Sequence, residues 1–226
     1  MKIELYHGSE NVIPRPVVGA GNPRNDYGLG FYCTKSVELA WEWASKGQAL
    51  GYANHYELEM RGLDVLRLGS DKYHILNWLA LLLKNREFDI AAPLPSQIRD
   101  YILETFLPAG WENYDVIVGY RADDSYFAFA KSFLNNTISL GQLQRAMKLG
   151  RLGQQTVLKS SKAFERLHFI EALPIDGTIY GAKRRARDEA AREEFLTIKK
   201  EIKAEDEILA IDILRQKWTD DDARLQ

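Results

Sequence analysis

The chain has 226 residues, a length that allows one well-filled core or at most two domains. Its 30 Lys and Arg residues nearly balance 32 Asp and Glu residues. The resulting net charge of −2 excludes a global basic field that would attract nucleic acid. A local basic patch would still suffice to bind nucleic acid. Cys33 is the only cysteine, which excludes an intrachain disulfide and predicts a reducing, cytoplasmic location.

The chain is predicted to begin with a strand and a long loop. Ile3 and Leu5 alternate with other residues as in a strand that ends at His7-Gly8-Ser9. No apolar run is long enough for a signal peptide or a membrane span, so we expect no membrane association. Residues 10–30 contain three prolines and four glycines and therefore predict a loop, and loops of this length are often functional.

A second strand and a helix are predicted next. Residues 31–34 have strand character, and Thr34 is the predicted N-cap of a helix over residues 36–47, with Glu38 as its capping-box partner. Residues 56–60 alternate between apolar and acidic side chains, which predicts a half-buried strand. The order strand, helix, strand indicates a mixed α and β protein.

Helices dominate the predicted middle of the chain. Helical periodicity covers residues 71–86, 96–106, 125–134 and 139–148. Ser96 is the expected cap of the second of these helices, and the short β-branched run at residues 115–120 predicts a buried strand. A strand, a short helix and a last strand are then predicted over residues 155–159, 161–166 and 168–173.

The composition changes after Gly181. Residues 183–226 hold 11 Lys and Arg and 12 Asp and Glu residues, with apolar residues at rough helical spacing. The basic run over residues 183–187 is followed at once by acidic residues, which favours a solvated helix face over a nucleic-acid contact. We therefore predict a core domain over residues 1–181 and a charged amphipathic helical extension over residues 182–226.

Three short motifs are spread through the core: Leu5-Tyr6-His7-Gly8-Ser9, Tyr27-Gly28-Leu29-Gly30-Phe31-Tyr32 and Gln154-Gln155-Thr156-Val157-Leu158. Together they resemble the ADP-ribosyltransferase superfamily, in its His–Tyr branch of diphtheria-toxin-like toxins and poly(ADP-ribose) polymerases. They are also similar to a bacterial domain family of unknown function. The resemblance implies an α+β fold with a split β-sheet core, flanking helices and NAD as co-substrate, without a metal.

In this resemblance the catalytic residues are His7, Tyr32 and Gln155. An imidazole at His7 can donate to a ribose hydroxyl, and the Tyr32 ring can stack under the nicotinamide. The Gly8 backbone can pair with the nicotinamide carboxamide because no side chain blocks the approach, and the Ser9 hydroxyl can contact the same amide.

Further cofactor-binding residues come from the second motif and the helix after it. Gly28 and Gly30 let the chain turn tightly into the strand, and Gly30 and Phe31 are expected at the NAD site. Trp43 lies 11 positions after Tyr32, where the His–Tyr branch often has a second aromatic residue. Trp43 would then close the nicotinamide pocket, and core packing is an equally open interpretation.

Gln155 is the main departure from the family, which usually carries a Glu there. A neutral amide orients a hydroxyl but supplies no charge, so transfer of a single ADP-ribose is expected rather than polymer elongation. Asp123 and Asp124 are candidate bases toward the acceptor, or they cap the following helix. Asp26 is a weaker candidate for the same electrostatic role, and Gln154 leaves a one-residue uncertainty in the strand.

The sequence thus predicts an NAD-dependent mono-ADP-ribosyltransferase. Relatives in bacterial conflict systems imply a toxin with a protein or nucleic-acid acceptor and a neutralising antitoxin partner. An NAD glycohydrolase and a catalytically silent module that binds NAD or ADP-ribose are the alternatives. His55, His74 and His168 have no metal-ligand spacing and are interpreted as structural, and Cys33 is expected to be buried rather than nucleophilic.

Overall fold

The computed structural model describes residues 1–45, 50–90, 92–122, 124–202, 204 and 206–225. The chain divides into two compact units whose segments alternate along the sequence. The sheet unit comprises Met1–Arg67, Gly110–Gly119 and Gln154–Arg187. The helical unit comprises Leu68–Ala109, Tyr120–Gly153 and Asp188–Gln226. The mixed α and β class predicted from the sequence is confirmed.

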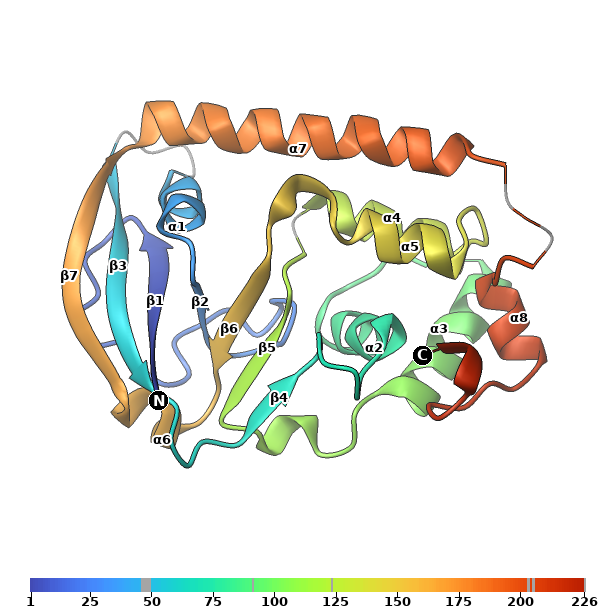
Figure 1. Cartoon of the computed structure of the whole chain (residues 1–226), viewed down its shortest axis with the longest axis horizontal. Helices are drawn as coiled ribbons and strands as arrows, with labels where there is room; N and C mark the ends of the chain where they lie inside the picture. The colour runs from blue at the N-terminus through green and yellow to red at the C-terminus, as the bar shows by residue number, and fades with distance from the viewer. Residues whose placement is uncertain (46–49, 91, 123, 203, 205, 226) are drawn as a thin grey trace. The chain divides into compact units, whose positions relative to one another are not determined.

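The sheet unit is built on one mixed sheet, which has seven strands in the described part of the chain (Figure 1). Their order across the sheet is β4-β5-β6-β2-β1-β3-β7. In chain order they are β1 (Lys2–Ser9), β2 (Phe31–Thr34), β3 (Leu50–Glu59), β4 (Val65–Arg67), β5 (Val116–Tyr120), β6 (Gln154–Leu158) and β7 (Leu167–Asp176). Strands β4 and β5 pair in parallel, whereas β1, β2, β3, β6 and β7 join through antiparallel pairs.

The strands differ from the prediction in three places. Strand β3 begins at Leu50, six residues before the predicted start, because its first half carries Gly51 and Ala53 instead of alternating large apolar residues. Strand β7 likewise continues to Asp176. The three-residue strand β4 was not predicted, since so short a segment shows no period.

One face of the sheet carries the apolar core of the sheet unit. Leu5 of β1, Cys33 of β2 and Leu58 of β3 are fully buried there. Residues two apart along each strand share this face, since successive side chains alternate between the two faces. The short helix α6 (Ser161–Glu165) adds the buried Ala163 to the same cluster. This core fixes which side chains of β1, β2 and β6 face the other way.

The other face is covered in part by helix α1 (Val37–Ala44). A Cβ on Gly8 would lie 2.0 Å from the carbonyl oxygen of Ala40, and one on Gly51 would lie 2.6 Å from that of Ala44. Both distances are far below any real carbon–oxygen contact, so the two glycines let the helix backbone lie directly on β1 and β3.

The predicted start of this helix was wrong. The helix begins at Val37, and the Oγ of Ser36 accepts the N–H of Leu39, so Ser36 is the N-cap. Thr34 is instead the last residue of β2, where it pairs with Tyr6. The Thr34 Oγ1 accepts the N–H of Ser36 at 3.2 Å instead, and the cap is supplied by Ser36.

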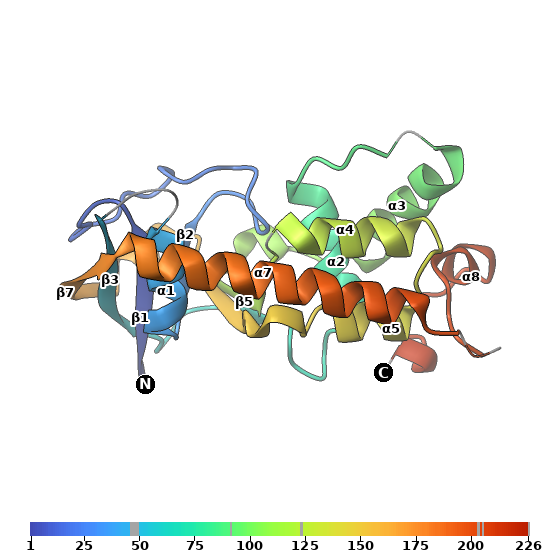
Figure 2. The same cartoon turned by 90° about the horizontal axis from the view of Figure 1, so that it is seen from above.

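The helical unit contains α2 (Ile75–Asn85), α3 (Pro93–Phe106), α4 (Asp124–Leu134), α5 (Leu140–Ala146) and α8 (Ala210–Arg215), seen from above in Figure 2. Helix α2 is buried from Ile75 to Leu83, a run in which Asn77 is polar and donates to the Phe106 carbonyl. It starts at Ile75, four residues later than predicted, and His74 is its N-cap. Helix α3 starts three residues earlier than predicted, because Pro93 suits a first turn and Ser96 donates to the carbonyl of Ile90 instead.

The C-terminal segment forms helix α7 (Gly177–Lys200) and α8. Helix α7 belongs to the sheet unit up to Arg187 and to the helical unit from Asp188. The division of the chain after Gly181 stays a prediction, and Gly181 itself lies within α7. One or two amphipathic helices were predicted for this segment, and the segment contains two helices, α7 and α8.

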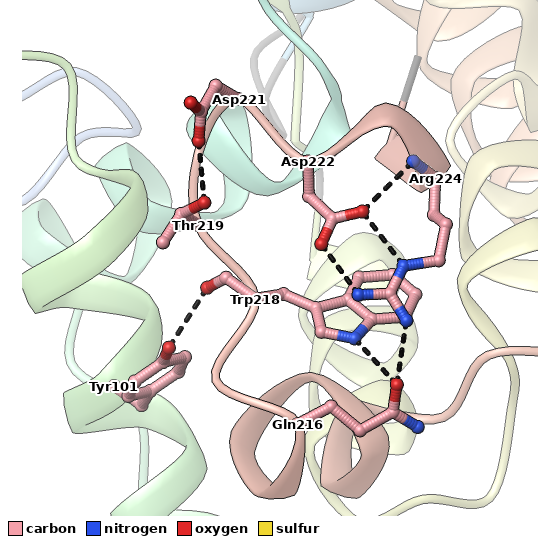
Figure 3. Close-up of polar contacts among 7 residues, drawn as sticks. All are labelled: Tyr101, Gln216, Trp218, Thr219, Asp221, Asp222 and Arg224. Atoms are coloured by element: carbon pink, nitrogen blue, oxygen red, sulfur yellow. Dashed lines mark hydrogen bonds and ion pairs between the residues drawn. The ribbon is translucent and has the colours of Figure 1, made fainter.

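The tail after α8 is folded against the helical unit around Trp218, which is 2% exposed (Figure 3). The Tyr101 hydroxyl of α3 donates to the Trp218 carbonyl at 2.9 Å. The Arg224 guanidinium lies 3.8 Å from the centroid of the Trp218 ring and pairs with Asp222. These contacts make the tail part of the unit's core.

Candidate functional site

The three predicted catalytic residues lie on three neighbouring strands of the sheet unit. His7 is on β1, Tyr32 on β2 and Gln155 on β6, and these strands are consecutive in the sheet. Strands β1 and β2 share one register pair, Tyr6 with Thr34. Beyond that pair, Nδ1 of His7 donates to the Tyr32 carbonyl oxygen at 2.7 Å, so the imidazole takes the place of a ladder bond.

This hydrogen bond determines what the His7 ring offers to a ligand. The Tyr32 carbonyl can only accept, so Nδ1 carries the hydrogen. Burial lowers the pKa of His7 below its ordinary value of 6.5, although the Tyr32 carbonyl acts to raise it. The ring is therefore neutral at pH 7, and Nε2 is an acceptor. In this tautomer Nε2 would accept from a ribose hydroxyl rather than donate to it, and a contact between His7 and a ribose stays a prediction.

Tyr32 fixes the end of the long loop. Its hydroxyl donates to the Gly28 carbonyl at 2.5 Å and lies 3.1 Å from the backbone nitrogen of Tyr27, from which it accepts. Gly28 has a φ of +70°, so the predicted tight turn at this glycine is confirmed. The Tyr32 side chain therefore holds the backbone of the segment Asp26–Gly28 next to β2.

Gln155 faces this segment from β6. It is 2% exposed, and its Nε2 donates to Oδ2 of Asp26 at 2.9 Å. Asp26 is 4% exposed. Gln154 is exposed, so it is Gln155 that points inward. The Asp26 carboxylate therefore lies against the predicted catalytic strand.

Lys159 is a site residue that the sequence did not single out. It follows β6, and its Nζ donates to the Tyr27 carbonyl at 2.6 Å and lies 5.4 Å from the centroid of the Trp111 ring. Burial lowers its pKa from the ordinary value, against the opposing charge of Glu112. A lysine directly after a strand carries no distinctive sequence signal, so only the fold reveals this contact.

Asn54 was also not predicted. It is fully buried on β3 opposite His7 and donates to the carbonyls of His7 and Asn11. Its Oδ1 accepts the N–H of Ile13 at 2.7 Å. Asn54 thus anchors the first part of the long loop to β1. A buried polar residue in a strand is a usable sequence signal, because such groups need partners.

The predicted nicotinamide-contacting residues of β1 and α1 lie close together. Gly8 faces α1, where a Cβ on it would be 2.7 Å from the Cβ of half-buried Trp43. The missing side chain at Gly8 therefore serves helix packing, and the predicted role of its backbone stays a prediction. The Ser9 hydroxyl donates to the Asn11 carbonyl and accepts the Asn11 N–H in a local turn.

Gly30, which directly precedes β2, and Phe31, its first residue, both have structural tasks. A Cβ on Gly30 would lie 2.6 Å from Cγ1 of Val157, so this glycine is needed for contact with β6; unlike Gly28, it does not have a positive φ. Phe31 is 9% exposed in the core, and its ring stacks on the His7 ring with centroids 4.3 Å apart. The Phe31 ring thus packs against one face of the His7 ring.

The candidate acceptor bases are only partly described. Asp123 lies outside the described residues, and Asp124 is described as the first residue of α4 without its side chain. Asp124 belongs to the helical unit, whereas His7, Tyr32 and Gln155 belong to the sheet unit. Their proposed role therefore stays a prediction.

Other reactive side chains give no further site. Cys33 is fully buried, as predicted, and burial raises the pKa of its thiol. Among the described residues, no group of three His, Cys, Asp or Glu side chains is arranged to hold a metal ion. No helix in the described part of the chain has the length and apolar character needed to span a membrane.

Comparison with protein families matches residues 3–169 to DUF3990, described as a protein of unknown function. The match covers most of the chain, and the protein therefore belongs to this family. No match was found among curated proteins or among solved structures. The matched region includes β1, β2 and β6, and thus every residue of the site on these strands.

Proposed function

We propose that the protein is an NAD-dependent mono-ADP-ribosyltransferase whose site lies where β1, β2 and β6 adjoin. The observation that carries the proposal is the convergence of the three motifs. His7, Tyr32 and Gln155 come from distant parts of the sequence and lie on neighbouring strands. The His7 imidazole forms a hydrogen bond to the backbone carbonyl of Tyr32. In this proposal the single register pair between β1 and β2 is the split of the sheet that the superfamily resemblance implies.

The site residues fit parts of NAD by their chemistry. Among the described residues, no group hydrogen-bonds Nε2 of His7, so this atom suits a ribose hydroxyl as donor partner. The aromatic side chains of Tyr32 and Trp43 suit a flat nicotinamide ring. Bound NAD supplies the reactive glycosidic bond, and this chain's residues orient it.

The proposed reaction transfers one ADP-ribose. The bond between ribose C1′ and the nicotinamide nitrogen breaks, and nicotinamide leaves as a neutral molecule with the bonding electron pair. A lone pair of the acceptor forms the new bond to C1′, and the acceptor's proton passes to solvent or to a nearby carboxylate. The acceptor class proposed from the resemblance is a macromolecule, protein or nucleic acid, with an antitoxin as a second partner.

The experiment uses the purified full chain with radiolabelled NAD, a cell lysate as protein acceptor and total RNA as nucleic-acid acceptor. We expect nicotinamide release and label in one acceptor fraction, and we expect His7→Ala to abolish both. The control Ile202→Ala changes a side chain that is 98% exposed and keeps full activity. Absence of nicotinamide release with every acceptor contradicts the proposal.

A second candidate is a module that binds NAD without turnover. It is favoured by the neutrality and burial of Gln155, which supplies no charge of its own. Calorimetry that detects NAD binding together with no nicotinamide release supports this alternative. Release of free ADP-ribose as the sole product, without labelled acceptor, identifies a glycohydrolase instead.

A further inference from the structure

Helix α1 lies between the sheet and the first part of helix α7 (Figure 1 and Figure 2). One side of α1 rests on β1, where a Cβ on Gly8 would be 2.0 Å from the Ala40 carbonyl oxygen and 2.7 Å from the Cβ of Trp43. Residues three positions apart share one side of a helix, so Ala40 and Trp43 both lie next to β1. The position of α1 on β1 therefore sets where Trp43 can meet a nicotinamide.

Two contacts join another side of α1 to α7. The ring of Tyr180 in α7 lies 5.0 Å from the ring of Trp41 in α1, measured between centroids. A Cβ on Gly181 would lie 3.5 Å from the carbonyl oxygen of Ser45, the residue that caps the end of α1. The start of α7 is thus packed along α1 within the sheet unit.

The third contact is a buried ion pair. Nη2 of Arg187 in α7 donates to Oε1 of Glu42 in α1 at 2.5 Å, and the Glu42 side chain is only 4% exposed. A buried carboxylate depends on its partners far more than an exposed one, because water cannot replace a partner that is removed. The pair therefore restrains α1 from the side that faces α7.

We infer that Arg187 is a positioning residue of the proposed site, which acts through Glu42 on Trp43. The inference rests on the proposed function and gives α7 a task in holding the nicotinamide end of NAD. Trp43 directly follows Glu42 in the helix, so a shift of Glu42 toward water carries Trp43 with it. His7 and Tyr32 are held by strand pairing and by their own hydrogen bond. Loss of the ion pair is therefore expected to affect the nicotinamide contact selectively.

This selectivity can be measured because ADP-ribose contains every part of NAD except nicotinamide. A residue that positions a nicotinamide contact affects the binding of NAD alone, whereas a general loss of structure weakens the binding of both ligands. The test titrates the full chain by calorimetry with ADP-ribose and with carba-NAD. In carba-NAD a carbon atom replaces the ring oxygen of the nicotinamide ribose, so no nicotinamide is released during the titration.

Arg187→Met removes the guanidinium and keeps an unbranched side chain. We expect this variant to bind carba-NAD about two- to tenfold more weakly, which is the size of one aromatic contact, and to bind ADP-ribose as the wild type does. The double variant Arg187→Met with Glu42→Met removes the buried carboxylate as well and leaves an apolar contact between the helices. We expect it to restore the wild-type affinity for carba-NAD.

Arg192→Met is the matched control in the same helix. Arg192 pairs with Asp188 at 2.8 Å, but its side chain is 51% exposed, and exposed pairs contribute little. We expect both affinities to stay at their wild-type values. Circular dichroism checks that each variant is folded. If Arg187→Met does not fold, Tyr180→Ala carries the test, because it removes the ring contact with Trp41 and should cause the same selective loss.

Three outcomes overturn the inference: equal weakening of both ligands in Arg187→Met, wild-type binding of both, or a folded double variant that binds carba-NAD as weakly as Arg187→Met. Nicotinamide release from NAD, measured separately, distinguishes this result from the proposed function. Selective weakening without any release by wild type keeps the inference and contradicts the transferase. Release by wild type without selective weakening in Arg187→Met does the reverse. A wild-type chain that binds neither ligand overturns both.

Discussion

In the proposed site, the His7 ring combines a structural task with a chemical one. Nδ1 completes the junction of β1 and β2, and this leaves Nε2 as an acceptor. A protonated imidazole would have a hydrogen on both nitrogens and could no longer accept. The direction of the His7 pKa shift therefore has a consequence for both activity and stability.

We expect NAD turnover to fall as the pH is lowered below 6.5 and through the pKa of His7 in the folded protein. The stability of the fold depends on pH in the same direction. The pKa of His7 is lower in the folded state than in the unfolded state, so the contribution of His7 to stability is present above pH 6.5 and is lost as the pH falls through the pKa of the folded state. Titration of the His7 ring by NMR checks this. A pKa at or above 6.5 contradicts it.

Gly8 shows how a motif residue is constrained by its neighbour. We expect Gly8→Ala to destabilise the fold by about 1–3 kcal/mol or more, because its Cβ meets the Ala40 carbonyl oxygen at 2.0 Å and α1 must move. Thermal unfolding measures the loss.

The matched control for this change is Gly141→Ala in helix α5, whose Cβ has no neighbour closer than 3.9 Å. It should be neutral or stabilise the protein by about 0.5–1 kcal/mol, as alanine does in a helix interior. Equal unfolding temperatures for Gly8→Ala and wild type would show that α1 does not lie against β1 as described.

At the scale of elements, one buried acid connects three segments of the sheet unit. Asp115, just before β5, accepts from the backbone of Asp64, from the Ser160 hydroxyl and from the Lys162 ammonium. Burial acts to raise the pKa of Asp115, but these three hydrogen bonds outweigh it and the pKa is lowered. The carboxylate thus joins β5 to the start of β4 and of α6.

We expect Asp115→Asn to lower the free energy of unfolding by about 1–3 kcal/mol. In wild type the contribution of Asp115 is present above pH 3.8 and is lost as the pH falls through the lower folded pKa. Urea unfolding at pH 7 and pH 3 measures both effects. A variant that loses as much stability at pH 3 as at pH 7 would contradict the assigned charge.

Local sequence patterns predicted most elements but not their contacts. Strand β1 follows from alternation, β2 from its strand-forming residue types and β5 from its β-branched run. The cap of α1 required the fold, because Thr34 and Ser36 are both suitable residue types and only Ser36 reaches the helix. The contact of Asp26 with Gln155 spans 129 residues, and no local pattern reports such a pair.

At the scale of the whole molecule, the charged C-terminal segment contributes to a core. Ile213 and Trp218 are 1% and 2% exposed within the helical unit. Gln142 of α5 donates to the Ile198 carbonyl of α7 at 2.7 Å. A high content of charged residues therefore does not make this segment a detachable appendage of the helical unit.

We expect Trp218→Ala to destabilise the protein by about 3–5 kcal/mol, since a large buried ring is lost and Arg224 loses its stacking partner. Chemical denaturation provides the measurement. Ile202→Ala, at a 98% exposed position in the same segment, should change the stability by no more than about 0.5 kcal/mol. Similar values for both variants would place Trp218 outside the core.

The pairing of β2 with β6 has a consequence for synthesis of the chain on the ribosome. His7 and Asp26 are made early, whereas Gln155 is made after two thirds of the chain is complete. Strand β3 can join β1 soon after both emerge, but β2 must wait for β6. The site therefore cannot be complete before two thirds of the chain has been made, and a prematurely terminated chain that lacks β6 also lacks Gln155.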